Sequence, residues 1–313
     1  MNNIVIRDIA PRLTGQAHPL SSADKIHLID SLTSAGVPAI EVSSFVRPDL
    51  IPGLADAEKV FAGIRRRPNV SLGCCVGNER GLRRAIDAGA DSAYFLLSAD
   101  ETFAHNNIGK STNESLRELE RMNELASTSS ITVGTYIIFA WGGPSGPPRR
   151  PADLLHLTRR LLDIGVEHWI LADSCGYASP RAIRETTTFA LEQLKDPNSL
   201  TVQIHDGRGM GLANIAELIK AGVTHIDTSL AGSGGHPAMP TTPGAGVCTE
   251  DVVQLLHLEG VSTGINLSAL VELSNWFVDS HRIPSNGFVR IPGPVPTADL
   301  ETNPPSDFAW RTA

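Results

Sequence analysis

The stretch KIHLIDSLTSAGVPAIEVSSF, residues 25–45, decides the fold of this chain. Residues 21–35 carry a helical pattern, because apolar side chains recur at the spacing of one helix face at Ile26, Ile29 and Leu32. The apolar run AIEVSSF, residues 39–45, follows and predicts a strand that is covered on both faces. A helix that leads into such a strand is typical of a parallel sheet with helical crossovers.

The same alternation continues through most of the chain. We expect eight strands, at 4–6, 39–45, 70–76, 92–98, 132–140, 168–173, 200–206 and 224–231. Helical patterns lie between them, at 56–64, 79–88, 113–126, 151–164, 180–194, 210–221 and 249–258. Eight such units in about 260 residues favour a closed (β/α)8 barrel over an open doubly wound sheet. The absence of a GxGxxG motif after the first strand points the same way.

We therefore predict an α/β fold, a TIM barrel with a C-terminal helical and Pro-rich extension. The barrel is expected to be the catalytic domain and to span residues 1–265. Residues 266–313 are expected to form one helix, at 267–280, and a Pro-rich tail.

Composition limits the classes of partner. The chain has 313 residues, 41% hydrophobic and 19% charged, with a formal net charge of -8, which favours a large core and disfavours a nucleic-acid binder. Its four cysteines form no CxxC pair, which is typical of a reducing compartment. No signal peptide pattern and no apolar run long enough for a membrane span is present, so we expect a cytoplasmic protein.

Polar side chains gather where the expected strands end. Active sites of such barrels form at the C-terminal ends of the strands, so these side chains are expected to share one rim. They are Asp8, Arg12, Glu41, Ser43, Ser44, Asn78, Ser98, Asp173, His205, Asp206, Arg208, His236 and Glu250. The loop that holds Gly234 and Gly235 is interpreted either as a plain turn or as a lid with backbone amides that bind an anion.

Three of these residues have an ordinary structural interpretation beside the functional one. Glu41 lies in an apolar strand and must point into the barrel or be paired, and an internal salt bridge to Arg7 or Arg12 would satisfy it. Asp173 could cap the next helix or bond a loop amide. His205 alone would suit a packed core, but its polar neighbours on the rim favour a functional role.

Several motifs together resemble the 3-hydroxy-3-methylglutaryl-CoA lyase family, within the pyruvate-carboxyltransferase-like TIM barrels. DIAPR resembles the family's EVGPR, and KIHLIDSLTSAGVPAIEVSSF resembles its K-x-x-L-I-x-x-L-x-x-A-G-x-x-x-I-E-x-x-S-F. NNIGKSTNES, LADSCGYASP, IHDGRGMGLAN, DTSLAGSGGHP and the final TED resemble further family motifs in the same order. The resemblance extends from about residue 3 to about residue 280.

The resemblance implies carbon–carbon cleavage of a 3-hydroxyacyl thioester, with a divalent metal that holds the reacting oxygens and a loop cysteine that protonates the departing enolate. This chain departs from that pattern at the implied metal ligands. Leu13, Gln203 and Gly246 stand where the family has Asp, His and Asn, and only His205 is kept. His236 replaces the loop cysteine, and Arg208 replaces a tyrosine.

We therefore predict a divergent carbon–carbon lyase or aldolase that acts on a 3-hydroxy acid or 3-hydroxyacyl thioester by retro-Claisen or retro-aldol chemistry, without the family's usual divalent metal. The predicted catalytic residues are Arg12, Glu41, Asp173, His205, Arg208, His236 and Glu250. The predicted substrate-binding residues are Ser44, Asn78, Asp206, Gly234 and Gly235. No cofactor is predicted, and Mg²⁺ or Mn²⁺ held by His205 with Glu41 or Asp206 is the alternative.

Two other functions stay open at this point. The barrel could be repurposed for decarboxylation, isomerisation or hydrolysis in a specialised biosynthetic pathway, because a fold does not dictate its reaction. It could also be a ligand binder without catalysis. The expected partner is a small carboxylate or acyl thioester, with no nucleic acid and no membrane, and a homodimer is the default assembly.

Overall fold

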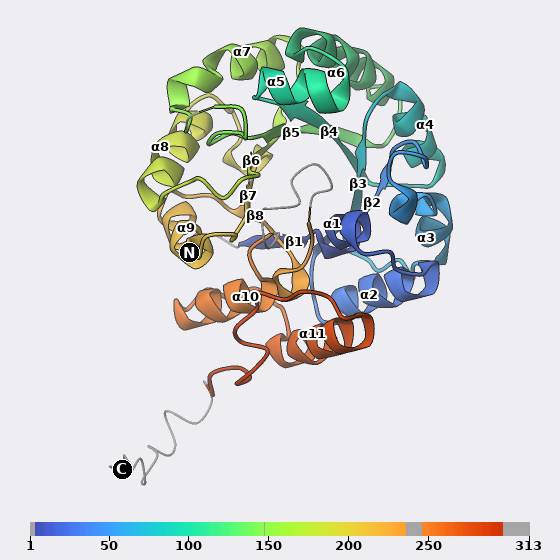
Figure 1. Ribbon diagram of the computed structural model, residues 1–313, viewed down its shortest axis with the longest axis vertical. Helices are drawn as coiled ribbons and strands as arrows, with labels where there is room; N and C mark the ends of the chain where they lie inside the picture. The colour runs from blue at the N-terminus through green and yellow to red at the C-terminus, as the bar shows by residue number, and fades with distance from the viewer. Residues whose placement is uncertain (1–3, 147, 236–245, 297–313) are drawn as a thin grey trace.

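The computed structural model describes residues 4–146, 148–235 and 246–296, and it confirms the predicted barrel. Eight parallel strands close in chain order, and β1 pairs with β8 to complete the ring (Figure 1). The strands are β1 (Val5–Asp8), β2 (Ala39–Phe45), β3 (Ser71–Val76), β4 (Ser92–Ser98), β5 (Thr132–Ile138), β6 (His168–Asp173), β7 (Leu200–Ile204) and β8 (His225–Thr228). Seven of them lie within a few residues of the expected bounds, and β8 is three residues shorter at its end than expected.

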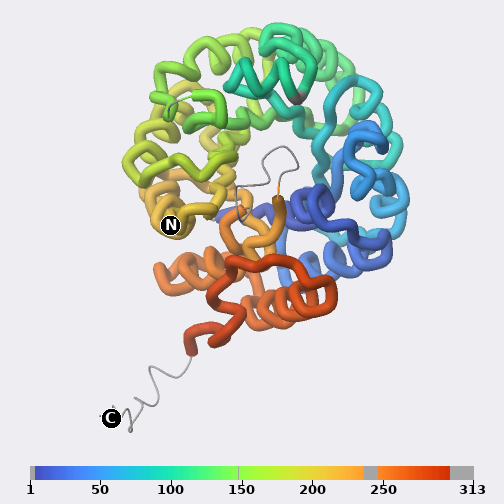
Figure 2. Tube along the Cα trace, in the orientation of Figure 1, coloured from blue at the N-terminus to red at the C-terminus, as the bar shows by residue number. Residues whose placement is uncertain are grey.

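Helices surround the barrel, as Figures 1 and 2 show. The longer ones are α2 (Ser22–Ser34), α3 (Ala57–Gly63), α4 (Glu79–Asp87), α6 (Thr112–Ala126), α7 (Leu155–Asp163), α8 (Pro180–Leu191), α9 (Gly211–Lys220), α10 (Thr249–Leu258) and α11 (Leu267–His281). The apolar faces of these helices pack on the outside of the strands and form the main core. None of the described helices is long and apolar enough to cross a membrane.

Short helices also occur where none was predicted. Helix α1 (Ala10–Ala17) follows β1 directly and lies beside the barrel mouth. Its sequence APRLTGQA is short and contains both proline and glycine, so helix propensity gave no signal, although proline is well tolerated in the first turn. Residues 101–108, for which no helix was expected, form α5 (Glu101–Phe103) and η2 (Ala104–Ile108).

The remaining single-turn helices lie in loops. They are η1 (Pro52–Leu54), η3 (Pro151–Leu154), η4 (Pro197–Ser199) and η5 (Leu230–Gly232). In the C-terminal region, α11 packs against both α10 and α2, and the His27 and Trp276 rings meet edge to face at 4.4 Å. The helix predicted at 267–280 is thus confirmed, while the domain boundary at 265 stays a prediction.

The inside of the barrel is filled by side chains that alternate with the outward-facing core residues. An apolar cluster of Cys75, Tyr136, Ile170 and Ala172 lies there, with Tyr94, Leu96 and Ile138 packed against it. Strand β2 shifts register against β3 between Glu41 and Ser43, which marks a β-bulge. Bulges of this kind re-aim side chains next to active sites, and here both Glu41 and Ser43 are fully buried.

Candidate active site

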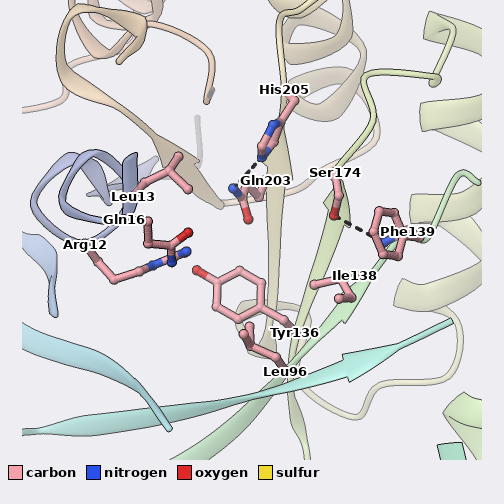
Figure 3. Close-up of a pocket in the computed structure, with 10 residues that line it drawn as sticks. All are labelled: Arg12, Leu13, Gln16, Leu96, Tyr136, Ile138, Phe139, Ser174, Gln203 and His205. Atoms are coloured by element: carbon pink, nitrogen blue, oxygen red, sulfur yellow. Dashed lines mark hydrogen bonds between the residues drawn. The ribbon is translucent and has the colours of Figure 1, made fainter. Parts of the chain in front are cut away.

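A small cavity opens at the C-terminal ends of β4 to β7, beside α1 (Figure 3). Its volume is about 60 Å³. It is lined by Arg12, Leu13 and Gln16 of α1, by Leu96, Tyr136 and Ile138 of the strands, and by Phe139, Ser174, Gln203 and His205. Of the predicted catalytic residues that the structure describes, Arg12 and His205 line it.

Arg12 is fixed by Glu41, which confirms the internal salt bridge considered from the sequence. The Arg12 Nε–H donates to Glu41 Oε2 at 2.7 Å, and Arg12 Nη2 lies 2.6 Å from the same oxygen. Both side chains are almost completely buried. Arg12 lines the cavity, and in the described part of the chain its Nη1 has no hydrogen-bond partner.

Glu41 Oε1 accepts hydrogen bonds from two further groups. The Tyr136 hydroxyl lies 2.9 Å from it, and the Cys75 thiol lies 3.1 Å from it. Burial would raise the pKa of Glu41, but the charges of Arg12 and Arg7 and these hydrogen bonds hold it below its usual value. A carboxylate with donors on both oxygens is a poor general base, so the geometry assigns Glu41 to holding Arg12.

A second ion pair, between Arg7 and Asp227, lies beside the Tyr136 hydroxyl. Arg7 donates through Nε and Nη2 to the two oxygens of Asp227, at 2.8 and 2.7 Å. The Tyr136 hydroxyl lies 3.1 Å from both Arg7 Nη2 and Asp227 Oδ2. The Arg7 guanidinium also stacks over the Tyr94 ring, with 4.2 Å between its Cζ atom and the ring centroid. One phenol therefore joins two buried ion pairs inside the barrel.

Gln203 and His205 form the upper wall of the cavity. Their side chains point to the same face of β7, and Gln203 Nε2 lies 3.0 Å from His205 Nε2. An amide N–H that donates to this ring nitrogen requires its lone pair, so the proton of a neutral imidazole then resides on Nδ1. Gln203 thus sets the tautomer of the one histidine that lines the cavity in the described residues.

The opposite wall is apolar and carries one strained residue. Leu13, Leu96 and Ile138 line it, and Phe139 follows with a backbone φ of 62°. A bulky residue in this left-handed region costs about 1–3 kcal/mol and persists where the surroundings impose it. Here the Phe139 N–H donates to Ser174 Oγ at 3.3 Å, and its ring packs edge to face on Phe103 with 4.6 Å between centroids.

Three predicted polar residues lie near the rim but bond the backbone instead of lining the cavity. Asp173 accepts hydrogen bonds from the Tyr177 and Ala178 amides at 2.8 and 3.1 Å, and burial raises its pKa to about 6. Asp206 accepts a bond from the Gly211 amide at 2.7 Å at the start of α9. Exposed Arg208 stacks over the Tyr177 ring and donates to the Cys175 carbonyl.

The other predictions are placed further away. Ser44 donates to the Cys75 carbonyl at 3.2 Å, and exposed Asn78 caps α4 by accepting the Gly81 amide. Glu250 is buried under η5, where it accepts the Ala231 amide at 2.9 Å and the Cys248 thiol at 3.0 Å. Ser44, Asn78 and Glu250 each bond a local group and do not line this cavity, and their roles at the site stay predictions.

The glycine-rich loop is described only in part. Gly234 and Gly235 have φ values of 129° and 159°, which suit glycine, and they follow Ser233, whose hydroxyl lies 2.8 Å from that of Thr14. His236 lies outside the described residues. Tyr136, Gln16 and the apolar lining residues were not predicted from the sequence, in which the inward alternation of β5 was the only signal for Tyr136.

Comparison with known proteins gives the family. A model of the HMGL-like family matches residues 7–277. The chain belongs to the HMGL-like family. It is 34% identical over 275 residues to the hydroxymethylglutaryl-CoA lyase of Bacillus subtilis, which covers 87% of this chain and 91% of that protein. It is therefore an enzyme of the carbon–carbon lyase class.

Solved structures of HMGL-like relatives have the same fold. The Bacillus subtilis HMG-CoA lyase superposes with a TM-score of 0.85 at 30% identity, over 96% of this chain and 98% of that one. An HMG-CoA lyase from Acinetobacter baumannii, in complex with coenzyme A and 3-methylmalate, superposes with a TM-score of 0.83 at 27% identity, over 98% and 97% of the two chains.

The HMGL-like family normally uses a divalent metal, and the described residues do not fit one. Leu13 brings only hydrocarbon to the cavity, and the Gln203 amide occupies the Nε2 side of His205. Gly246 forms a backbone bridge with His205 but has no side chain to offer. Within the described ranges, no three His, Cys, Asp or Glu side chains gather as metal ligands, whereas hard cations need several oxygen donors. The alternative ligands Glu41 and Asp206 are already engaged.

Proposed function

We propose that this lyase cleaves a small 3-hydroxy acid or 3-hydroxyacyl thioester by retro-Claisen or retro-aldol chemistry without the family's divalent metal. The observation that carries the proposal is the position of Arg12, which lines the cavity while Glu41 holds its Nε and Nη2. Cleavage of the carbon–carbon bond leaves negative charge on an enolate oxygen, and a fixed cation in a dry site stabilises that charge strongly.

His205 is the proposed proton carrier. The substrate hydroxyl must lose its proton for the bond to break, and an imidazole is suited to take it near neutral pH. Gln203 donates to Nε2, which carries the lone pair of the neutral imidazole, so substrate binding has to displace this amide before Nε2 can take the proton. Gln16 and Ser174 line the same cavity and offer hydrogen bonds to the substrate oxygens.

The substrate class is supported by the cavity and by one relative. An engineered cavity of about 150 Å³ is known to bind benzene, so about 60 Å³ suits a group of only a few atoms. The Acinetobacter baumannii relative was solved with coenzyme A and 3-methylmalate, which is a small branched hydroxy acid. We propose a substrate of this kind, with the thioester favoured by that complex, and a cytoplasmic location for the reaction.

The test is an assay of chelator-treated enzyme on 3-hydroxyacyl thioesters and on the free acids, with products identified by mass spectrometry. We expect cleavage products at a rate that added Mg²⁺ or Mn²⁺ changes by less than about twofold, because Arg12 supplies the charge. Activity that appears only after metal addition contradicts the metal-independent mechanism. Products of decarboxylation, isomerisation or hydrolysis, or binding with no turnover, contradict the lyase reaction itself.

A further inference from the structure

We propose that Arg7 and Asp227 act together as positioning residues, directing the Tyr136 hydroxyl to Glu41 so that Glu41 holds Arg12 at the cavity. Neither residue of this pair lines the cavity. The inference rests on the proposed function, because the position of Arg12 matters to catalysis only if its charge acts on the substrate.

The first step is the direction of the Tyr136 proton. A phenol has one proton to donate, and Arg7 Nη2, at 3.1 Å, can only donate to the phenol oxygen. The proton must therefore go to Asp227 Oδ2, at 3.1 Å, or to Glu41 Oε1, at 2.9 Å. Two buried carboxylates thus compete for one hydroxyl.

The second step is the occupancy of the two carboxylates. Each oxygen of Asp227 already accepts a charge-assisted bond from Arg7, at 2.8 and 2.7 Å. In Glu41, both contacts with Arg12 go to Oε2, so Oε1 otherwise has only a thiol, which is a weak donor. The Tyr136 hydroxyl therefore donates to Glu41, because Arg7 already donates to both oxygens of Asp227.

The third step is what happens without Arg7. Asp227 would then be a completely buried carboxylate with no cation at hydrogen-bond distance, and the phenol would be its nearest donor. Transfer of that hydrogen bond removes a donor from Glu41 and raises the pKa of Glu41. A protonated Glu41 is neutral and holds Arg12 through one weaker contact, so the guanidinium can turn away from the cavity.

Several charged or titratable groups surround Glu41 and contribute to this balance. They are Arg12 of α1, Arg7 of β1, Cys74 and Cys75 of β3, Tyr136 of β5 and Asp227 of β8. The four side chains of the two ion pairs sum to zero net charge. Removal of Arg7 alone leaves an unbalanced anion, whereas removal of both Arg7 and Asp227 does not.

The experiment compares the wild type with Arg7→Met, with Arg7→Met/Asp227→Leu and with the conservative variant Arg7→Lys. The titration of the Glu41 carboxyl carbon is followed by ¹³C NMR, with the signal assigned by Glu41→Gln. We expect Arg7→Met to raise the Glu41 midpoint by about one pH unit or more. Both Arg7→Lys, which keeps the cation, and Arg7→Met/Asp227→Leu, which removes the competitor, should return it toward the wild-type value.

The acid limb of the pH profile of kcat/KM should move with the Glu41 midpoint in each variant. An unchanged midpoint in Arg7→Met overturns the proposal, as does a double variant that keeps the full shift. If Arg7→Met does not fold, Tyr136→Phe removes the same donor and must show the same rise. The NMR titration needs no substrate, so a wild-type enzyme without lyase activity refutes the proposed function and leaves this test intact.

Discussion

Arg12 and Glu41 meet through a single carboxylate oxygen. Arg12 Nε and Nη2 lie 2.7 and 2.6 Å from Glu41 Oε2, and the other oxygen of Glu41 accepts the Tyr136 hydroxyl. This arrangement uses the Nε and Nη2 edge of the guanidinium and does not involve Nη1, and Arg12 lines the cavity. Because Nη1 does not contact Glu41, the guanidinium can pair with Glu41 and still bind a second anion.

Replacement of Arg12 by lysine tests the contribution of Nη1 to catalysis. Lysine can pair with Glu41, but its ammonium has no second, fixed edge to present to an enolate. We expect Arg12→Lys to lower kcat/KM by about 10²- to 10³-fold. Arg47→Lys is the matched control, because Arg47 is exposed, pairs with Asp49 and does not line the cavity. Equal activity of both variants would contradict the role of Arg12.

The two basic residues after β7 are expected to differ sharply. His205 lines the cavity, whereas exposed Arg208 stacks on Tyr177. We expect His205→Ala to reduce kcat by about 100-fold or more, as the loss of a general base does. Arg208→Ala should stay within about threefold of the wild type. Steady-state kinetics of the two purified variants decide this, and a large loss in Arg208→Ala alone would reverse the assignment.

The buried Asp8 carboxylate should make stability depend on pH. It accepts the Ala10 amide at 2.8 Å and the Thr249 hydroxyl at 2.6 Å, and burial raises its pKa from 3.8 to about 7. The folded state thus binds this proton more tightly than the unfolded chain. The stabilisation is complete below pH 3.8 and is lost as the pH rises through about 7.

Asp8→Asn removes that titration. Between pH 4 and pH 8, the free energy of unfolding of the wild type should fall relative to that of Asp8→Asn by on the order of 3–4 kcal/mol. Urea unfolding at both pH values measures the difference. Asp163→Asn serves as the control because this carboxylate is largely exposed. A difference that is the same at both pH values would show that Asp8 does not titrate in this range.

Glu250 is expected to matter for folding and not for chemistry. Its Oε2 accepts the Ala231 amide and the Cys248 thiol, and burial raises its pKa. Glu250→Gln keeps an acceptor at this place, so kcat should stay within about threefold of the wild type. Glu250→Ala leaves the buried Ala231 amide without its partner and should lower the free energy of unfolding by about 1–3 kcal/mol. A large loss of kcat in a stable Glu250→Gln variant would show that Glu250 takes part in catalysis.

The sequence predicted the barrel because long apolar strands and helical patterns repeat at short, regular intervals. It placed Arg12 and His205 at the cavity, since strand ends of a parallel barrel share one rim. It did not predict α1, which has only eight residues and includes a proline and a glycine, although this helix carries Arg12, Leu13 and Gln16 to the cavity. Asp173 and Asp206 are of a residue type common in catalytic sites, but in the structure they accept hydrogen bonds from nearby backbone amides.

The sequence by itself determined the fold and the family, because each depends on residue type and order. Only the tertiary structure decided which polar groups meet. Glu41 bonds Tyr136, 95 residues away, and Arg7 bonds Asp227, 220 residues away. Such contacts form only when β1 closes on β8, since closure turns the inward side chains of all strands toward one another.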